Sequence, residues 1–194
     1  MTISREAGTQ GTAVAEEVGS RLQWQVYDHQ LLELVAQDMG VRAKLLESID
    51  EKRTTWLLED FESALGVPMV TEPAYVHHLV RTVLALSSHG ECVIVGRGAA
   101  QILSGPHTFR VRLVAPLQWR LQAVCREHGM KMDEAKAYLQ DTDREHAAFV
   151  RELFQKDPAE AHQYDLIINR AHFGVAECAG LIVEGVRALQ PRRS

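Results

Sequence analysis

The sequence predicts an α/β fold in which helices cover both faces of a parallel sheet. Two observations support this class. Short apolar segments alternate with amphipathic stretches of about 10 to 15 residues, which is typical of βαβ units. In addition, the segment Cys92–Val95 is apolar throughout and is bounded by glycines. A continuous apolar run of this kind indicates a strand that is buried on both faces, because helices cover the sheet on either side.

Composition limits the classes of protein that the chain can represent. It has 194 residues, 46% of them hydrophobic, and a formal net charge of −5. This length buries one sizeable core, so we expect a single domain over residues 1–194. The acidic balance argues against a general nucleic-acid or membrane-surface binder, so any site for anions must be local. No apolar run reaches the roughly 18 residues that span a bilayer, and we expect a cytoplasmic protein whose three cysteines are free thiols.

The first half of the chain predicts a strand, a loop and a helix. Met1–Ile3 is a stub of strand, and a glycine-containing loop leads to a helix over Ala13–Leu22 with an apolar residue every fourth position. A short extended segment follows at Trp24–Asp28. Further helices are predicted over residues 31–39, 41–64 and 75–87.

The second half continues the alternation of strands and helices. Beyond Cys92–Val95, strands are predicted over Thr108–Val114 and Tyr164–Asn169. Pro116 is expected in the first turn of the helix after the second of these strands, and Asp143 is expected to cap a helix of its own. The predicted helices are Ala99–Leu103, Leu117–His128, Asp133–Gln140, Asp143–Phe154 and Val175–Leu189.

In a parallel sheet, ligands bind beyond the carboxyl ends of the strands. This rule selects the loop Ser4–Thr12, Asp28 with its neighbours, and Gly96–Gly98. The loop joins a strand to a helix, so its backbone N–H groups could cradle phosphate oxygens. The usual phosphate-loop pattern is incomplete, because Gln10 stands at the lysine position and only Thr12 offers a hydroxyl for magnesium. A turn whose glycines merely permit tight packing is the alternative.

Several arginines occupy positions that favour an anionic ligand. Arg97 lies between two glycines directly after a buried strand, where either an anion or a surface carboxylate would be its partner. Arg110 and Arg112 share one face of their strand, and a phosphate contact or an edge strand in solvent explains them equally well. Arg144 and Arg151 lie on one stripe of a helix, which suits a phosphoryl clamp or a solvated face.

In this order, the segments resemble the cytidylate kinase-like family of P-loop nucleoside monophosphate kinases. The resemblance implies a P-loop NTPase-type three-layer α/β/α fold with a parallel sheet, a helical acceptor-binding insert at about 41–89 and a helical lid at about 126–151. It covers nearly the whole chain. The motifs that carry it are Thr2–Gly8 leading to Gly11, Tyr27-Asp28 followed by Leu31-Leu32, Cys92–Ala99, Phe109–Pro116, Asp143–Arg151 and Tyr164–Asn169.

The resemblance also implies an activity, namely phosphoryl transfer from ATP, with Mg²⁺, to a nucleoside monophosphate, for which we expect CMP or dCMP. The ATP phosphates would bind Ser4, Arg5, Gly8, Thr9, Gln10, Gly11 and Thr12, with Arg120 nearby and the metal at Thr12. The acceptor would bind Tyr27, Asp28, Arg97 and Gly98. The arginines that would surround the transferring phosphoryl group are Arg97, Arg144 and Arg151.

Three features depart from an ordinary cytidylate kinase. Gln10 replaces the loop lysine, Val95 stands where an acidic residue would precede the Gly-Arg pair, and the first strand is short. The acid would be an outer ligand of hydrated magnesium. Arg5 could restore the missing charge by folding over the loop and so take part in catalysis, a hypothesis that rests on its position alone.

Two further functions therefore stay open. One is a nucleotide-binding protein with little or no turnover and a sensory or regulatory role, and the other is a kinase of another small acceptor. Base preference is not readable, since Asp28, His29 and Arg42 are equal candidates for base contacts. A homodimer also stays open, because an apolar cluster could pack on the core or on a second subunit. Its members are Trp56, Leu57, Leu58 and Phe61.

Overall fold

The computed structural model describes residues 1–28 and 73–189, so the helices predicted over 31–39 and 41–64 lie outside the described residues. Within these ranges, strands form one sheet in the order β2-β3-β1-β4-β5, and all neighbouring strands are parallel. The strands are β1 (Thr2–Arg5), β2 (Gln25–Tyr27), β3 (Cys92–Val95), β4 (Arg110–Val114) and β5 (Leu166–Asn169). The predicted parallel sheet is confirmed.

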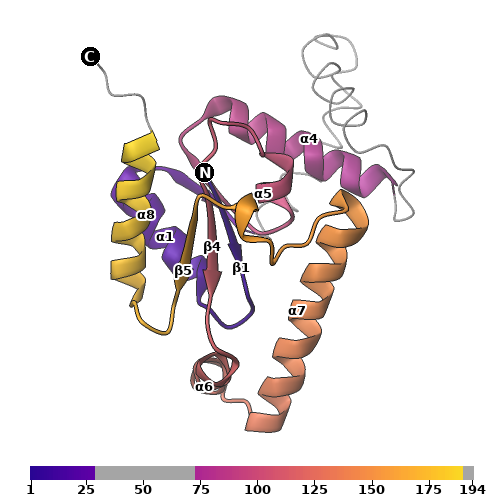
Figure 1. Ribbon diagram of the computed structural model, residues 1–194, viewed down its shortest axis with the longest axis vertical. Coiled ribbons are helices and arrows are strands. Elements are labelled where there is room, and N and C mark those ends of the chain that lie inside the picture. The colour runs from indigo at the N-terminus through magenta and orange to yellow at the C-terminus, as the bar shows by residue number, and fades with distance from the viewer. Residues whose placement is uncertain (29–72, 190–194) are drawn as a thin grey trace.

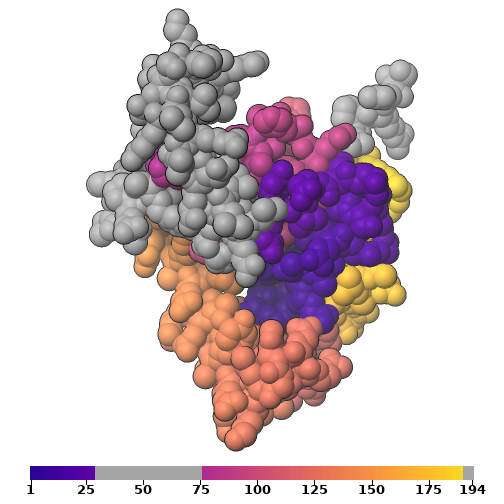
Figure 2. Space-filling view, turned by 180° about the vertical axis from the view of Figure 1, so that it is seen from behind, coloured from indigo at the N-terminus to yellow at the C-terminus, as the bar shows by residue number. Residues whose placement is uncertain are grey.

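Helices cover both faces of this sheet (Figure 1). They are α1 (Gly11–Leu22), α4 (Pro73–His89), α5 (Ala99–Ile102), α6 (Leu117–His128), α7 (Met132–Phe154) and α8 (Val175–Leu189), with a short 3₁₀ turn η1 (Ala161–Gln163). One face packs on α1 and α8, and the other packs on α4, α5 and the end of α7. Seen from behind (Figure 2), α6 and the start of α7 form the lower end of the molecule. The three-layer α/β/α prediction is confirmed.

Alternation along the strands divides the core into two parts. Ile3 and Leu113 belong to the cluster under α1 and α8, whereas Ile94 belongs to the cluster under α4 and α5. All side chains of β3 are buried, as its continuous apolar run predicts. Because β4 lies between β1 and β5, the interpretation of Arg110 and Arg112 as residues of an edge strand is wrong.

The helix α7 differs from its prediction because it is continuous, where two helices were expected. Asp143 does not cap a helix start. Its carboxylate instead accepts hydrogen bonds from the backbone N–H of Ala7 and from the guanidinium of Arg120. A side chain that finds partners on another part of the chain no longer competes for its own backbone, so the helix runs on.

Two boundaries also differ from prediction. Pro116 is the N-cap of α6 and lies just before the first turn. The strand β1 continues through Ser4 and Arg5, because it pairs with β4 along its whole length. Both residues are polar, so apolar patterning gave no signal for this extension.

The prediction that the three cysteines are free thiols is confirmed. Cys92 and Cys178 are buried, Cys125 is partly buried, and all three are free thiols. In the ranges 1–28 and 73–189, no helix is both long and apolar enough to cross a membrane.

Gly98 lies where α5 approaches the end of α7. Its φ is +69°, and a Cβ atom there would overlap the ring of Phe154. We expect Gly98→Ala to lower the free energy of unfolding by about 2 kcal/mol, because the new methyl group overpacks this contact. Urea denaturation measures the loss. Gly90→Ala is the matched control, since Gly90 has a φ of +72° with no atom within 4 Å. Equal losses in the two variants would contradict the steric explanation.

Candidate functional site

The carboxyl ends of the strands bring together the three segments that the sequence selected. The strands β1 and β4 are neighbours, but the chain leaves β1 for α1 on one face of the sheet and leaves β4 for α6, which packs against the start of α7. Connections that diverge between neighbouring parallel strands open a crevice for ligands. Two cavities of about 500 Å³ and about 320 Å³ lie at this edge. Arg5, Glu6 and His146 line both of them. These three residues therefore form a shared wall between the two cavities.

The smaller cavity, which we call the loop cavity, follows the turn between β1 and α1. Every residue from Arg5 to Ala13 lines it, together with parts of α6 and α7. Gln10 is the N-cap of α1 with a left-handed φ of 56°, and its side chain makes no capping hydrogen bond. The first N–H groups of α1 therefore lack a cap from this side chain, which suits an anionic ligand. Of the residues expected at the ATP phosphates, Ser4 lines the larger cavity instead.

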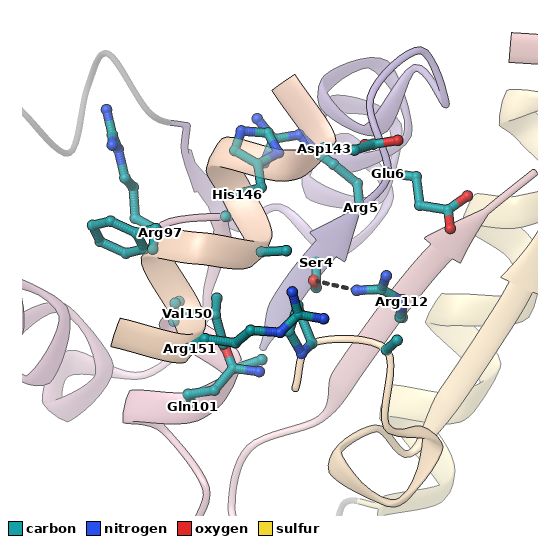
Figure 3. A pocket seen from close by; sticks show the side chains of 18 of the residues that line it. Ser4, Arg5, Glu6, Arg97, Gln101, Arg112, Asp143, His146, Val150 and Arg151 are labelled. Atoms are coloured by element: carbon teal, nitrogen blue, oxygen red, sulfur yellow. Dashed lines mark hydrogen bonds between the residues drawn. The ribbon is translucent and has the colours of Figure 1, made fainter. Parts of the chain in front are cut away.

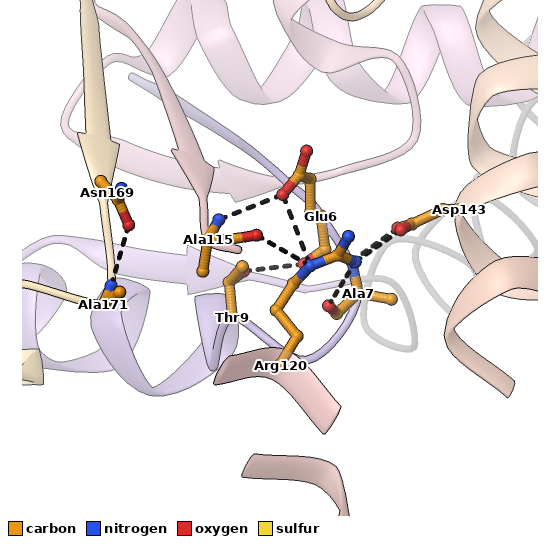
Figure 4. A network of polar contacts seen from close by, with 8 residues as sticks. All are labelled: Glu6, Ala7, Thr9, Ala115, Arg120, Asp143, Asn169 and Ala171. Carbon is orange, nitrogen blue, oxygen red and sulfur yellow. Dashed lines mark hydrogen bonds and ion pairs between the residues drawn. The ribbon is translucent and has the colours of Figure 1, made fainter. Parts of the chain in front are cut away.

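Arg120 connects the loop to α7 (Figure 4). Its Nη1 donates to the carbonyl of Ala7 at 3.2 Å and to Asp143 Oδ2 at 2.5 Å, and its Nε donates to the carbonyl of Ala115 at 3.0 Å. Asp143 Oδ1 accepts a hydrogen bond from the Ala7 N–H at 2.8 Å, and Glu6 Oε2 accepts one from the Ala115 N–H at 3.1 Å. Arg120 lines neither cavity. In this structure its hydrogen bonds hold the loop in place at Ala7 and connect it to Asp143.

Gln10 is held by an arginine that the sequence analysis did not select. Arg170 directly follows β5, and its Nη2 donates to Gln10 Oε1 at 2.7 Å. Its Nε donates to the Thr9 carbonyl at 3.1 Å. The side-chain amide of Gln10 in turn donates to the carboxylate of Glu127 on α6. The strand-end rule could have found Arg170 if it had been applied to β5 as well as to the earlier strands.

The larger cavity, which we call the arginine cavity, is lined by Arg5, Arg97, Arg112 and Arg151 (Figure 3). Arg112 is 9% exposed, and its Nη1 donates to Ser4 Oγ at 3.3 Å and to the Tyr164 hydroxyl at 3.4 Å. In the described ranges, no carboxylate lies within ion-pair distance of Arg112. The structure thus brings Arg112 to a cavity, which is one of the two interpretations that its strand position left open.

Carboxylates offset much of the positive charge in the arginine cavity. Four acidic residues line it, namely Glu6, Asp143, Glu145 and Asp157. Two of these, Glu6 and Asp143, already pair with Arg120, and Asp157 pairs with Arg151 at 3.2 Å. Arg112 is therefore a cation of this cavity that forms no ion pair with a carboxylate of the described ranges.

The Arg5 side chain lies between the loop and the end of β3. Its side chain packs on Gly11, and its guanidinium lies against Gly96 at the end of β3. Burial lowers the pKa of Arg5, the Asp28 carboxylate opposes this shift, and the Arg97 cation adds to it. The ends of β1, β2 and β3 therefore meet at this side chain. Arg97 has a left-handed φ of 51°, and its side chain points away from Arg112 (Figure 3).

The predicted lid residues fall into two groups. Arg151 lines the arginine cavity, whereas Arg144 pairs with Asp141 at 2.7 Å and lines neither cavity. Gly98, which was expected at the acceptor, also lines the arginine cavity. Tyr27 packs against the core beneath α4. His146 on α7 belongs to the shared wall, although no spacing in the sequence pointed to it. Burial and the cations of Arg5 and Arg97 lower its pKa, which favours the neutral ring.

The residues of the loop cavity fit a nucleotide phosphate and a hydrated magnesium ion. Thr12 contributes a hydroxyl and Glu6 a carboxylate to the lining. Mg²⁺ keeps several of its waters and needs only one or two carboxylates besides the phosphates. In residues 1–28 and 73–189, no three His, Cys, Asp or Glu side chains gather into a complete protein metal site. The donor set therefore suits a metal that arrives with a phosphate ligand.

A parallel α/β sheet with a glycine-containing loop after its central strand, and with two cavities that meet at that loop, is the architecture of a P-loop-type α/β fold. The chain belongs to the cytidylate kinase-like family, whose model matches residues 1–172. This confirms the resemblance that the motifs of the sequence indicated.

Curated relatives are distant. The cytidylate kinase of Methanopyrus kandleri is 23% identical over 115 residues, which are 55% of this chain and 60% of that protein. The cytidylate kinase of Thermococcus kodakarensis is 21% identical over 98% of this chain and 89% of its own length. A uronate isomerase of Corynebacterium glutamicum is 24% identical over 87% of this chain, but the match covers 33% of that protein. The chain thus spans less than two thirds of the Methanopyrus and Corynebacterium proteins.

Solved structures share the fold. An uncharacterized protein from Eubacterium ventriosum matches with a TM-score of 0.77 at 18% identity, over 96% of this chain and 97% of that one. Shikimate kinase from Acinetobacter baumannii in complex with shikimate matches with a TM-score of 0.52 at 14% identity, over 98% and 95% of the two chains. At these identities the similarity establishes the fold alone.

Proposed function

We propose that the chain transfers a phosphoryl group from ATP, with Mg²⁺, to a nucleoside monophosphate, with CMP or dCMP as the expected acceptor. The observation that supports this most is the pair of cavities that meet at the shared wall of Arg5, Glu6 and His146. Phosphoryl transfer requires the attacking and leaving oxygens to lie roughly in line across the transferred group. Two cavities that share one wall would let a phosphate donor and an acceptor approach each other from its two sides.

The proposal assigns the ATP phosphates to the loop cavity and the acceptor phosphate to the arginine cavity. Thr12 would hold Mg²⁺, which neutralises negative charge on the phosphates when it is bound. Arg5 would contact the transferring group from the shared wall. Arg97 and Gly98 would bind the acceptor with Tyr27 and Asp28, and Arg112 is a further buried cation that lines the same cavity.

The lid arginines complete the proposed site. Arg151 already faces the arginine cavity, and it would exchange Asp157 for a phosphate oxygen. Arg144 would have to leave Asp141 and turn toward the loop before it could take part. Closure of such helices over a substrate is a common step in phosphotransferases.

Two observations favour the alternative of a nucleotide-binding protein with little turnover. Gln10 carries no charge at the lysine position, and Val95 is fully buried next to the Gly-Arg pair, where an acid would otherwise stand. A kinase of another small acceptor also agrees with Arg112, because a guanidinium binds carboxylates as well as phosphates. The cytoplasmic location remains part of the proposal. The candidates for base recognition and for a dimer contact, His29, Arg42 and the cluster at 56–61, lie outside the described residues.

A coupled assay for ADP release tests the proposal. We expect ATP turnover that depends on CMP or dCMP when each nucleoside monophosphate is supplied in turn. Arg97→Ala and Arg151→Ala should each lower kcat/KM about 10- to 100-fold, because each removes a hydrogen bond from a charged donor. Arg187→Ala is the matched control, since Arg187 lies on α8 and pairs with Glu184.

The outcomes separate the candidate functions. If no nucleoside monophosphate stimulates ADP release at high enzyme concentration while ATP still binds, the proposed kinase activity is contradicted. That result would support a nucleotide-binding protein. Rates in Arg97→Ala and Arg151→Ala that equal the rate of the unchanged chain would contradict the assignment of the arginine cavity to the acceptor.

A further inference from the structure

A buried positive charge lies directly behind the loop cavity. Arg170 is 3% exposed, and its hydrogen bonds reach neutral acceptors: the Thr9 carbonyl at 3.1 Å, Gln10 Oε1 at 2.7 Å, the Phe173 carbonyl and the Cys178 thiol at 3.8 Å. Its guanidinium also lies 5.5 Å from the centroid of the Trp119 ring. Across residues 1–28 and 73–189, no carboxylate stands within ion-pair distance of it.

Such an arrangement is costly unless the charge serves a ligand. Burying a cation without a counter-ion opposes folding, and a cation–π contact offsets only part of that cost. The field of a buried charge is screened less than that of a surface charge, so it extends into a neighbouring cavity. The residues between Arg170 and the loop cavity are Thr9 and Gln10, and both line that cavity.

Gln10 carries a second, independent sign that an anion belongs there. Its side-chain Nε2 donates to the carboxylate of Glu127, which lines the loop cavity. A carboxylate oxygen is the same kind of acceptor as a phosphate oxygen. The amide of Gln10 thus accepts from a buried cation on one side and donates to an anion on the other.

We propose that Arg170 is a positioning residue that gives this loop its positive charge, acting through Gln10 and the Thr9 carbonyl in place of the absent lysine. The proposal rests on the proposed binding of ATP phosphates by the loop. Donation from Arg170 to the Thr9 carbonyl polarises the peptide between Thr9 and Gln10, whose N–H becomes a stronger donor. Donation to Gln10 Oε1 polarises the side-chain amide in the same sense.

A pair of substitutions separates this role from a merely structural one. In Gln10→Lys, the new ammonium group would stand against the guanidinium of Arg170, so the usual loop residue should bring no gain. In Arg170→Met, the buried charge is lost while much of the side-chain volume remains. In the double variant, the lysine at position 10 replaces the lost charge. A purely structural Arg170 would predict no such rescue.

The measurement is the dissociation constant of ATP by calorimetry, without an acceptor, repeated with inorganic triphosphate. We expect Arg170→Met to weaken ATP binding about 10- to 100-fold. Gln10→Lys alone should bind ATP as tightly as the unchanged chain or more weakly. The double variant should recover an affinity within about threefold of that of the unchanged chain. Arg170→Lys, which keeps the charge with fewer donors, should lose less than Arg170→Met.

Other results would overturn the proposal. Unchanged ATP binding in a folded Arg170→Met variant, or a double variant as weak as Arg170→Met, would do so. If Arg170→Met does not fold, Gln10→Lys decides: ATP binding more than tenfold tighter than in the unchanged chain would show that the loop lacked the charge. Because turnover is not measured, an inactive enzyme that binds ATP leaves the test valid. No binding of ATP or triphosphate to the unchanged chain would contradict the proposed function itself.

Discussion

Replacing Arg5 with alanine is expected to lower the rate of phosphoryl transfer by about 10²- to 10³-fold. The guanidinium of Arg5 stands in the wall shared by both cavities, against Gly96, where the transferred group would pass. A cation held there stabilises charge that develops on the equatorial oxygens. Steady-state ADP release at saturating ATP measures the effect, and calorimetry with a phosphate analogue measures binding alone.

Two further variants control for charge and position. Arg5→Lys keeps the charge but loses the planar fork, so we expect a smaller loss than in Arg5→Ala. Gly11→Ala keeps the arginine but displaces it, because the new Cβ would lie 2.5 Å from Arg5 Cδ. We expect its rate to fall between those of the unchanged chain and Arg5→Ala. If Arg5→Ala keeps the full rate and full affinity for the analogue, the role proposed for Arg5 is wrong.

Arg120→Met is expected to lower the free energy of unfolding by about 3 kcal/mol, and the thermal midpoint by about 6 to 12 °C. The Arg120 side chain is 10% exposed, whereas the side chains of Asp143 and Glu6 are 32% and 27% exposed. The substitution leaves both carboxylates without their buried cation. The effect falls at the lower end of the range for buried ion pairs, because water still reaches the carboxylates.

Urea denaturation followed by circular dichroism measures this loss. Arg126→Met is the matched control on the same helix, since Arg126 is exposed and donates to the carbonyl of Gln122 within its own helix. We expect it to change the free energy of unfolding by less than about 0.5 kcal/mol. Asp143→Asn keeps an acceptor for the Ala7 N–H and should cost less than Arg120→Met. Similar losses in the Arg120 and Arg126 variants would show that the network around Arg120 does not hold the loop.

Much of the fold could be predicted from local patterns. The strand Cys92–Val95 and the helix Val175–Leu189 lie where apolar spacing placed them. These patterns are reliable because burial against a layer selects a fixed period of apolar residues. The split of α7 was wrong, because the partners of Asp143 lie far away in sequence, at Ala7 and Arg120.

The site was predictable only in part. Strand ends and glycines selected the loop, Asp28 and Arg97, since parallel strands deliver their carboxyl ends to one edge of the sheet. The role of Arg112 stayed ambiguous, because it depends on whether β4 is a central or an edge strand of the sheet. No local pattern in the sequence determines that position. His146 was missed, because only packing brings α7 beside the loop. Arg170 was missed although it directly follows the strand β5, where the strand-end rule points.

The sequence by itself determined the class of fold, the family and the loop that lacks a lysine, because these depend on residue types and spacings along the chain. The tertiary structure decided which charges meet there. It placed Arg5 between two cavities, turned Arg120 toward α7 and buried Arg170 behind Gln10. These outcomes depend on the order of strands and on contacts across more than a hundred residues, such as the 160 positions between Gln10 and Arg170. Packing alone sets such contacts, and periodicity does not record them.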